Sequence, residues 1–589
     1  MRTVNVNMAL RTRAGKNGTV ILQVPGKGAT ETKQVLYAAG EKGNVTNGQI
    51  GRVLNGTTKT NGHFSPVCNG HAVEKAVDIE VEKKSKKLSD QGPNEKVPIL
   101  MVIITVYNYV VLAIIGYIKE YLWKLGVLKS PGACESPKLK DFVPLYQDFD
   151  SIYIRNIYRK LKDVFEVPIC SVPGAEMDVM ERLSPDYNWT YTYTGRSFRC
   201  INLGSYNYLG FAENSGPRNE MVESAARYYG NGVCSSRREL GTTDKVEELE
   251  RLTAHFLGTE AAMTFSMGFA TNALNIPSLV SEGCLVISDK FNHASLVLGI
   301  RLSGASVKVF EHNDIDDLER VLRGAISSGQ PRTHKPWKKI LVVVEGIYSM
   351  EGSIVKLPEI VALKKKYKFY LYLDEAHSIG ALGLRGRGVL DFYGIDPKEV
   401  DILMGTFTKS FGACGGYIGG SSELIDHIRR HSHSSAYGAS APAPIVQQII
   451  SSMTAIMGED GTNTGQNRIK QLAWNTKYMR HRLREMKFIV IGHDQSPVIP
   501  VMIYMPTSVG AFSRISRLRG LSTVSVGFPA TNLIEARIRI CLSAAHTKEI
   551  LDKALEIISD VGDEIWAKRS KLLPPPALSD EELKQPVWC

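Results

Sequence analysis

Three short apolar runs constrain the fold of this chain more than any other feature. They cover Ile340–Val344, Phe369–Leu373 and Ile402–Met404, and they lack the polar–apolar alternation of a half-exposed strand. Such runs are typical of strands buried on both faces of a parallel sheet, with helices in the connections. Each run ends in polar residues, and α/β sheets bind ligands at the carboxyl ends of their strands. The sequence therefore predicts an α/β fold with its functional site at that edge.

The third run leads directly into a turn that carries a lysine. This turn, residues 405–413, reads GTFTKSFGA, so Lys409 lies among hydroxyls, glycines and apolar residues. Confinement of an amine lowers its pKa and leaves it able to attack a carbonyl. Thr406 and Thr408 add hydroxyls that can bind phosphate oxygens. A Schiff-base cofactor with a phosphate group fits this composition, and an ordinary strand-to-helix turn fits the stretch alone equally well.

Acidic and basic side chains also follow other predicted strands. Asp374 and His377 come directly after the second run, and His293 lies in a polar turn after a short strand at 284–288. A carboxylate beside a pyridine nitrogen keeps that nitrogen protonated, which makes the ring an electron sink. The same aspartate could instead be a helix N-cap, and a lone histidine is usually structural. The convergence of an acid, a histidine and a lysine at one edge favours the catalytic interpretation.

Two further segments have the composition of binding sites. Residues 266–272, SMGFATN, follow a short strand and open a helix, and free N–H groups at a helix N-terminus bind anions. Arg537 and Arg539 lie two apart and therefore share one face of a predicted strand at 536–543. An arginine fixed on a strand can hold a carboxylate through two hydrogen bonds. The alternative is an edge strand protected by charge.

The amino-terminal part of the chain differs from this α/β body. Residues 1–96 are rich in Gly, Asn, Thr and Lys and are predicted to be a disordered tail. Residues 97–118 form an uncharged run long enough to cross a bilayer about 30 Å thick, so we expect a transmembrane or membrane-embedded helix. A helix in the membrane interface and a buried core helix are the alternatives. The remaining predicted divisions are a connecting helical region at 119–194, a large domain at 195–450, a smaller α/β domain at 451–573 and a tail at 574–589.

The net charge of +11 and the nine cysteines narrow the function classes. A basic chain suggests nucleic acid, but the sequence has neither an Arg/Lys run interleaved with aromatics nor a nucleic-acid recognition motif. An anionic membrane surface or a polyphosphate substrate accounts for the charge equally well. The cysteines lack zinc-ligand spacing, so neither a metal site nor a disulfide scaffold is expected.

These motifs, in this order, resemble those of the α-oxoamine synthases, which are pyridoxal-phosphate enzymes of fold type I. The similarity spans roughly residues 195–560. The segments CSSRRELGTT, GTFTKSFGACGGYIGG and GFPATNLIEARIRICLSAAHTKEILD are most similar to the catalytic long-chain-base subunits of eukaryotic serine palmitoyltransferases. The resemblance implies a decarboxylating condensation of L-serine with palmitoyl-CoA to 3-oxosphinganine, the first step of sphingolipid synthesis.

The resemblance also implies a role for each site residue. Lys409 would hold pyridoxal 5′-phosphate as a Schiff base, and Asp374 would pair with its ring nitrogen. His377 would contact the ring hydroxyl, and His293 would stack on the ring. Arg539 matches the position that binds the amino-acid carboxylate. The phosphate would be bound by backbone groups of Gly268 and Phe269 and by the hydroxyls of Thr406 and Thr408.

Partners and location follow from the same resemblance. It implies an obligate heterodimer with a related non-catalytic long-chain-base subunit, small membrane accessory subunits, and a catalytic domain facing the cytosol at the endoplasmic reticulum membrane. One departure is that many relatives have a histidine where this chain has Asp244 and Lys245. The alternatives are a synthase that uses glycine or another acyl-CoA, and a non-catalytic scaffold subunit. Lys409 and Asp374 argue against the scaffold, since such a subunit is expected to lack the lysine.

Overall fold

The computed structural model describes most of the chain after the amino-terminal tail. The predicted disordered tail at 1–96 lies outside the described residues, except for Glu95. The described part belongs to one compact unit, Ala76–Cys589. The described residues are 95, 97–128, 136–143, 152–579, 581, 582 and 584.

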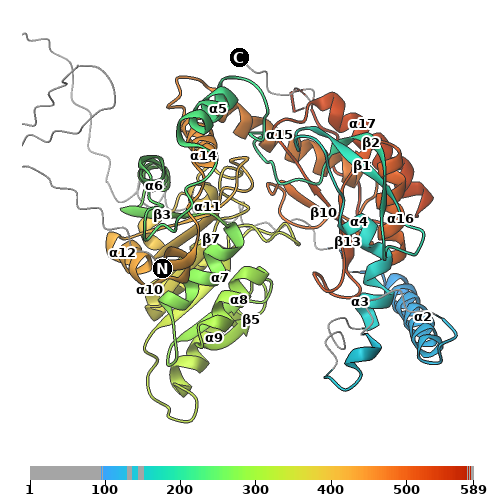
Figure 1. The fold of residues 1–589 in the computed structure, drawn as a ribbon, viewed down its shortest axis with the longest axis horizontal. Coiled ribbons are helices and arrows are strands. Elements are labelled where there is room, and N and C mark those ends of the chain that lie inside the picture. The colour runs from blue at the N-terminus through green and yellow to red at the C-terminus, as the bar shows by residue number, and fades with distance from the viewer. Residues whose placement is uncertain are drawn as a thin grey trace, which may run out of the picture. The chain divides into compact units, whose positions relative to one another are not determined.

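A seven-stranded sheet forms the centre of the larger domain (Figure 1). In spatial order its strands are β3 (Ala261–Phe265), β9 (Gly416–Gly420), β8 (Ile402–Thr406), β7 (Tyr370–Asp374), β6 (Ile340–Glu345), β4 (Leu285–Asp289) and β5 (Ser306–Phe310). Strand β9 runs antiparallel to both of its neighbours, and the other pairs are parallel. The three apolar runs therefore form β6, β7 and β8, side by side, and the predicted mostly parallel α/β fold is confirmed.

Helices on both faces bury these strands, as the absence of alternation predicts. On β6, Val342 and Val344 face one hydrophobic core, while Leu341 and Val343 face the other. All four side chains are at most 1% exposed. The first core includes α6 (Asp244–Leu257), α9 (Ile315–Ser328), α10 (Leu357–Tyr367) and α14 (Ala443–Met457), and the second includes α7 (Gly268–Leu279), α8 (Ala294–Leu302) and α12 (Ser422–His431).

A smaller unit is assembled from both ends of the described chain. Its two sheets are β10 (Val498–Tyr504), β13 (Ala536–Cys541) and β12 (Val524–Val526), and β1 (Glu176–Leu183), β2 (Thr192–Asn202) and β11 (Leu521–Ser522). Strand β2 pairs with β11, although more than 300 residues separate them. Figure 1 shows β1 and β2 beside the carboxyl-terminal helices α15 (Thr464–Glu485), α16 (Pro506–Leu518) and α17 (Lys548–Glu564). The smaller unit therefore includes β1 and β2 in addition to the carboxyl-terminal segment predicted at 451–573.

One predicted division needs correction. The region at 119–194, expected to be helical, contains β1 and the start of β2 as well as short helices. The charged sequence of β1 has little strand character, and antiparallel pairing with β2 decides its conformation. The remaining elements are η1 (Pro137–Leu139), α3 (Ile152–Asn156), η2 (Tyr158–Leu161), α4 (Lys162–Phe165), α5 (Pro217–Tyr229), α11 (Gly388–Tyr393), η3 (Pro397–Glu399) and α13 (His433–Tyr437).

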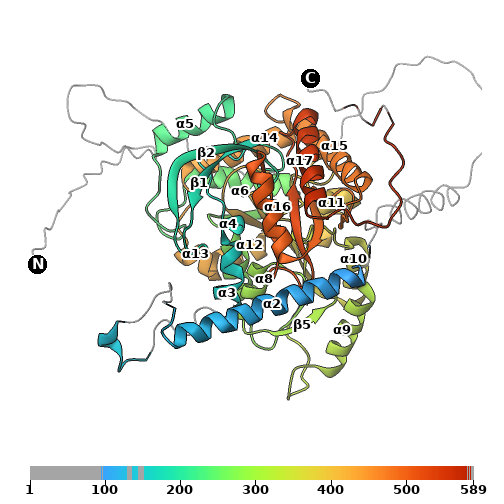
Figure 2. The same ribbon diagram turned by 90° about the vertical axis from the view of Figure 1, so that its right-hand side faces the viewer.

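Residues 99–118 of the apolar run at 97–118 lie in helix α2 (Ile99–Lys124), which is long and apolar enough to cross a membrane. Figure 2 shows α2 lying along the body. Met101 packs against Ile489, Met502 and Tyr504 of the smaller unit. The buried stripe of α2 is Met101, Thr105, Tyr109 and Gly116. Large apolar side chains on its other faces are exposed, among them Ile99, Ile103, Tyr107, Val110, Ile114 and Ile118.

Candidate active site

The carboxyl ends of β6, β7 and β8 border a cavity of about 400 Å³. Side chains from these strand ends, from the start of α7 and from the turn before α8 line it. Eight of the nine predicted site residues line this cavity, namely Gly268, Phe269, His293, Asp374, His377, Thr406, Thr408 and Lys409. The structure therefore brings together residues that are spread over more than 140 positions of the sequence.

Lys409 lies in the turn that follows β8. Its side chain is partly buried, and this burial lowers the pKa of its ammonium to about 8. The nitrogen lies 5.6 Å from the centre of the Tyr206 ring. At neutral pH a much larger fraction of this amine is uncharged than in an ordinary lysine, which is the property that the sequence predicted.

Asp374 ends β7 and is 4% exposed. Its carboxylate accepts hydrogen bonds from Asn272 Nδ2 (2.8 Å) and from the backbone N–H of Ala376 (2.9 Å). Asn272 is itself oriented by the Tyr372 hydroxyl, which donates to Asn272 Oδ1 (2.7 Å). The next helix begins only at Gly388, so the alternative of a helix N-cap is wrong. The carboxylate is fixed where it borders the cavity.

His377 is buried between two tyrosines. Its Nδ1 lies 2.7 Å from the Tyr208 hydroxyl, and its ring meets Tyr206 edge to face at 5.0 Å. Burial lowers the pKa of the imidazole well below its usual value, and the positive charge of Lys409 lowers it further. The neutral form is therefore favoured.

His293 is held at the start of α8 by three contacts. Its Nδ1 accepts the backbone N–H of Ser295 (3.2 Å) and lies 2.7 Å from the Ser295 hydroxyl. Its backbone N–H donates to the carboxylate of Glu345. Partial burial lowers the pKa of the imidazole. These contacts fix a histidine ring that borders the cavity near Phe269, at a ring distance of 6.0 Å.

The end of the cavity near α7 is suited to an anion. No side chain of the described residues caps the first N–H groups of α7, so they remain free at the positive end of the helix dipole. A Cβ atom at Gly268 would lie 2.7 Å from Thr406 Oγ1, so only glycine allows this close approach. Thr406 Oγ1 donates to the carbonyl of Gly415 (2.8 Å) and lies 2.7 Å from Thr408 Oγ1. Hydroxyls and N–H groups thus gather where a phosphate would fit.

Arg539, the ninth predicted residue, lies behind Tyr206 and outside the cavity lining. Strand β13 is the central strand of its sheet and Arg539 is 4% exposed, so the alternative of a charged edge strand is wrong. The guanidinium packs over Tyr206 at 4.7 Å and donates weakly to the carbonyl of Ser349 (3.5 Å). Its Nε is buried without a hydrogen-bond partner among the described residues. Arg537, on the same face, instead pairs with Glu535 (3.1 Å).

Three residues of the site had no role in the sequence prediction. Tyr206 lies between Lys409 and Arg539, and Asn272 orients Asp374. Glu345 ends β6 and is 3% exposed; burial, with a smaller effect of Asp374, raises the pKa of its carboxyl well above the usual value. Glu345 could have been found by the rule that found Asp374, because it is the polar residue after an apolar run.

A lysine of lowered pKa, a fixed carboxylate and an anion site at this edge of a mostly parallel sheet define a pyridoxal-phosphate enzyme of fold type I. The family model described as aminotransferase class I and II matches residues 199–558. The chain therefore belongs to this family, and within it to the α-oxoamine synthases, as the sequence motifs predicted. Its cofactor is pyridoxal 5′-phosphate.

Relatives and solved structures show which members of the family this chain resembles. Serine palmitoyltransferase 3 of Homo sapiens is 50% identical over 539 residues, which cover 90% of this chain and 97% of that protein. Serine palmitoyltransferase 2 of Caenorhabditis elegans is 53% identical over 483 residues, covering 82% and 87%. The solved serine palmitoyltransferase of Sphingomonas wittichii has a TM-score of 0.63 at 27% identity and covers 72% of this chain and 99% of its own. A serine palmitoyltransferase from S. paucimobilis with PLP bound has a TM-score of 0.60 at 27% identity, covering 69% and 94%.

Proposed function

We propose that this chain is the catalytic subunit of a serine palmitoyltransferase. The reaction joins the Cα of L-serine to the acyl carbon of palmitoyl-CoA, and releases CoA and CO₂ to give 3-oxosphinganine. The observation that carries the proposal is the single cavity that contains Lys409, Asp374 and His377. The chain is about half identical, over most of its length, to proteins named serine palmitoyltransferase. A subunit that served only as a scaffold would not need the lysine.

The residues present fit pyridoxal 5′-phosphate. When bound, it supplies an electron sink that stabilises negative charge at the Cα of the amino acid. Asp374 would hold the proton on the ring nitrogen, and the neutral His377 would bond the ring hydroxyl. His293 would lie against the ring. The phosphate would be bound by the backbone of Gly268 and Phe269 and by the hydroxyls of Thr406 and Thr408.

Lys409 has two tasks in this proposal. It would hold the cofactor covalently, and after serine displaces it the free amine would take the proton from Cα. A pKa of about 8 suits both tasks, because the uncharged amine is then accessible near neutral pH. The Cα would then form a bond to the thioester carbonyl carbon as the bond to the CoA sulfur breaks and CoA leaves. Loss of CO₂ would return an electron pair to Cα, and the Lys409 ammonium would supply the proton that it needs.

Arg539 is proposed to bind the serine carboxylate. Its buried Nε has a spare hydrogen-bond donor, and its weak contacts with Tyr206 and Ser349 leave the guanidinium able to accept a better partner. The Tyr206 ring lies close to both Arg539 (4.7 Å) and Lys409 (5.6 Å), so it would border a serine bound by both residues.

We further propose that a related, non-catalytic long-chain-base subunit covers the mouth of the cavity. Met267 (60% exposed) and Phe269 (44%) border the cavity, and Leu240 (86%) and Tyr437 (81%) lie on neighbouring segments. Helix α13 packs against α7, and the loop of Leu240 bridges to residue 439 through Ser236. We call these four side chains the mouth surface. Exposed apolar residues gathered beside a site are typical of an interface.

Helix α2 is proposed to attach the enzyme to the endoplasmic reticulum membrane, with the body in the cytosol. It contacts the body from Met101 to Glu120, about 28 Å along its axis. A helix crossing the bilayer would draw this polar body into the hydrocarbon, so a helix embedded in the interface is better supported than a spanning one. The choice of organelle rests on the resemblance to the eukaryotic enzymes. Protease protection of intact microsomes tests the orientation, because the chain segments before and after α2 should both remain accessible to protease from the cytosol.

The direct test is the absorbance of the purified complex. We expect a visible band from the covalent link between cofactor and Lys409, a change of that band on addition of serine, and loss of the band in Lys409→Ala. The matched control is Lys308→Ala, which removes an exposed lysine from β5 outside the cavity. A Lys409→Ala variant that kept the band would contradict the assignment.

The substrate is tested with a panel of labelled amino acids. Serine, glycine and alanine are each assayed with palmitoyl-CoA and with shorter and longer acyl-CoA, and the CO₂ released is measured. We expect serine with palmitoyl-CoA to give the largest kcat/KM. A preference for glycine would identify a different α-oxoamine synthase.

A further inference from the structure

A single tyrosine joins two distant parts of the smaller unit. Tyr153, on α3, donates a hydrogen bond from its hydroxyl to the backbone carbonyl of Phe528 (2.6 Å). The two rings also meet edge to face, 4.9 Å apart at 86°. Phe528 belongs to residues 527–535, the loop that connects β12 to β13. One side chain therefore holds both the backbone and the ring of this loop.

Helix α3 is also fixed on α2. The Glu120 carboxylate of α2 accepts hydrogen bonds from Arg155 Nε and from Asn156 Nδ2, both at 2.9 Å. A Cβ atom at Gly116 would lie 3.1 Å from Asn156 Cβ, so the two helices are in close contact there. Tyr109 of α2 lies beside Tyr153. Tyr153 therefore stands between the proposed membrane helix and the 527–535 loop.

The far end of the loop reaches the wall of the cavity. Glu535 accepts from Asn532 Nδ2 (3.2 Å) and pairs with Arg537 (3.1 Å). Arg537 donates in turn to the carbonyl of Met350 (2.9 Å), and Met350 lines the cavity. Arg539 depends less on this path, because its contact with Met350 is a long one to the sulfur (3.7 Å) and Tyr206 and Ser349 also contact its guanidinium.

We propose that Tyr153 is a positioning residue that fixes the 527–535 loop against α3 and α2 and thereby sets the cavity wall at Met350. Phe528 (37% exposed) and Leu533 (39%) give the loop an apolar outer surface. An alkyl chain that leaves the membrane interface for the cavity meets such a surface favourably. We call this fixing of the loop by Tyr153 the clamp. The acyl substrate, more than serine, is therefore the one whose binding depends on it. This last step rests on the proposed function, and the clamp itself does not.

The clamp is tested by hydrogen exchange on the holoenzyme complex. Tyr153→Phe removes only the hydroxyl, and Tyr153→Leu also removes the ring contact. The amides of Ala530 and Glu535, which bond within the loop, should exchange about threefold to tenfold faster in Tyr153→Phe, as expected for loss of one hydrogen bond. Tyr153→Leu should have a larger effect. The control is Tyr158→Phe on η2, since Tyr158 stacks on Phe165 instead (5.0 Å).

Steady-state kinetics test the link to the acyl substrate. In Tyr153→Phe we expect KM for palmitoyl-CoA to rise about threefold to tenfold, with a smaller change in KM for serine and an unchanged cofactor absorbance. Unchanged loop exchange in both variants overturns the clamp. Faster exchange with an unchanged KM for palmitoyl-CoA, or an equal rise for serine, overturns the role in acyl binding. If the wild-type complex did not use palmitoyl-CoA, the proposed function would fail while the exchange measurement still decided the clamp.

Discussion

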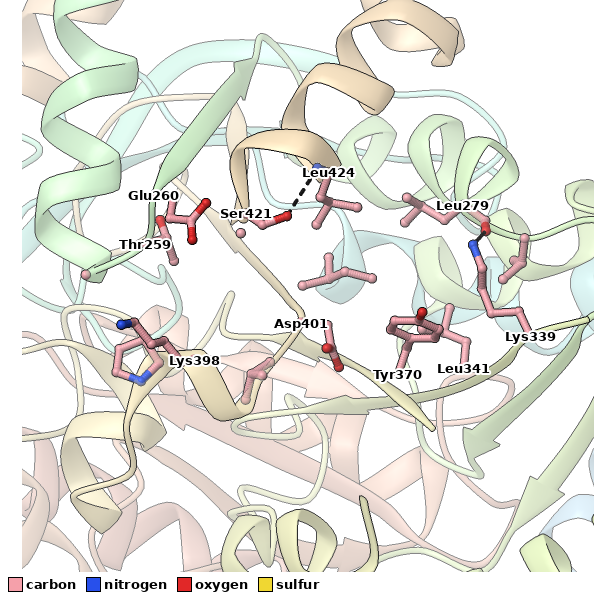
Figure 3. A pocket seen from close by; sticks show the side chains of 16 residues that line it. Thr259, Glu260, Leu279, Lys339, Leu341, Tyr370, Lys398, Asp401, Ser421 and Leu424 are labelled. Atoms are coloured by element: carbon pink, nitrogen blue, oxygen red, sulfur yellow. Dashed lines mark hydrogen bonds between the residues drawn. The ribbon is translucent and has the colours of Figure 1, made fainter. Parts of the chain in front are cut away.

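Two cavities lie at opposite ends of the same parallel strands, and the larger one is not the candidate active site. The cavity at the carboxyl ends has a volume of about 400 Å³, and the one at the amino ends, shown in Figure 3, about 510 Å³. We call them the upper and the lower cavity. Both have apolar walls and charged side chains, so neither size nor composition separates them.

Two charged groups of the lower cavity, Asp401 and Lys339, already have partners. The carboxylate of Asp401 accepts the backbone N–H of Leu371 and pairs with Lys364, both at 2.7 Å. The ammonium of Lys339 donates to the carbonyl of Leu279 (2.6 Å), as the dashed line in Figure 3 shows. These groups connect the strands to the helices around them, and little of their hydrogen-bonding capacity is left for a ligand.

The upper cavity contains ionisable side chains whose charged forms are destabilised by burial. Burial lowers the pKa of Lys409 to about 8 and that of His377 well below its usual value, and it raises the pKa of Glu345 well above. Such groups cost stability and are kept where chemistry needs them. The comparison teaches that a site is better located by unfavourable electrostatics than by the volume of a cavity.

The sharpest way to break this comparison is to neutralise one aspartate in each cavity. Asp374→Asn keeps the shape of the side chain but removes the charge that would hold the ring nitrogen protonated. We expect kcat to fall by about 10²- to 10³-fold, the range typical of removing one electrostatic contact made in the transition state. The cofactor should still bind, so its absorbance band serves as the control for folding.

Asp401→Asn is the matched variant at the lower cavity. It removes the partly buried charge that pairs with Lys364, so we expect the free energy of unfolding to fall by about 1–3 kcal/mol. The value of kcat should remain within twofold of the wild type. A large loss of kcat in this variant, with the fold intact, would show that the lower cavity takes part in the reaction.

A second prediction concerns the pH dependence of Lys409 in the cofactor-free protein. Because burial holds its pKa near 8, its reactivity toward an amine-specific reagent should rise with pH and reach half its maximum at about pH 8. An exposed lysine with a pKa of about 10.4 is then less than 1% uncharged, so Lys409 should react about 100-fold faster at that pH. Mass spectrometry of labelled peptides measures both rates. A midpoint above pH 9.5 would contradict the confined site.

The sequence predicted the strand ends well and the contacts between them poorly. Lys409 and Asp374 were found because an apolar run and the polar residue after it are local in the sequence. Asn272 contacts Asp374 across 102 positions, and no local pattern marks that contact. The strand at Glu176–Leu183 was missed for a related reason, since its pairing with β2 decides the conformation. The position of Arg539 behind Tyr206 likewise depends on how two chain segments pack.

A third prediction uses two asparagines one turn apart on α7. Asn272 donates to Asp374, whereas Asn275 donates to the carbonyl of Thr271 within its own helix (2.8 Å). Asn272→Ala should lower kcat about tenfold, because the carboxylate loses the donor that orients it. Asn275 is as buried as Asn272, so Asn275→Ala should lower the free energy of unfolding about as much as Asn272→Ala does. It should leave kcat unchanged. Equal effects on kcat would mean that the orientation of Asp374 is not what matters.

The smallest expected effect comes from filling the lower cavity. Val280 lines it, is 3% exposed and has an extended backbone that suits a branched side chain. Val280→Ile adds one methylene to the empty space, which should stabilise the fold by about 0.8 kcal/mol and raise Tm by about 1–2 °C. Because we interpret the lower cavity as imperfect packing between the strands and the helices around them, kcat and both KM values should not change. A lower Tm would show that the added methylene does not fit the empty space. A change in either KM would show that the lower cavity takes part in binding, and the distinction between the two ends of the sheet would fail.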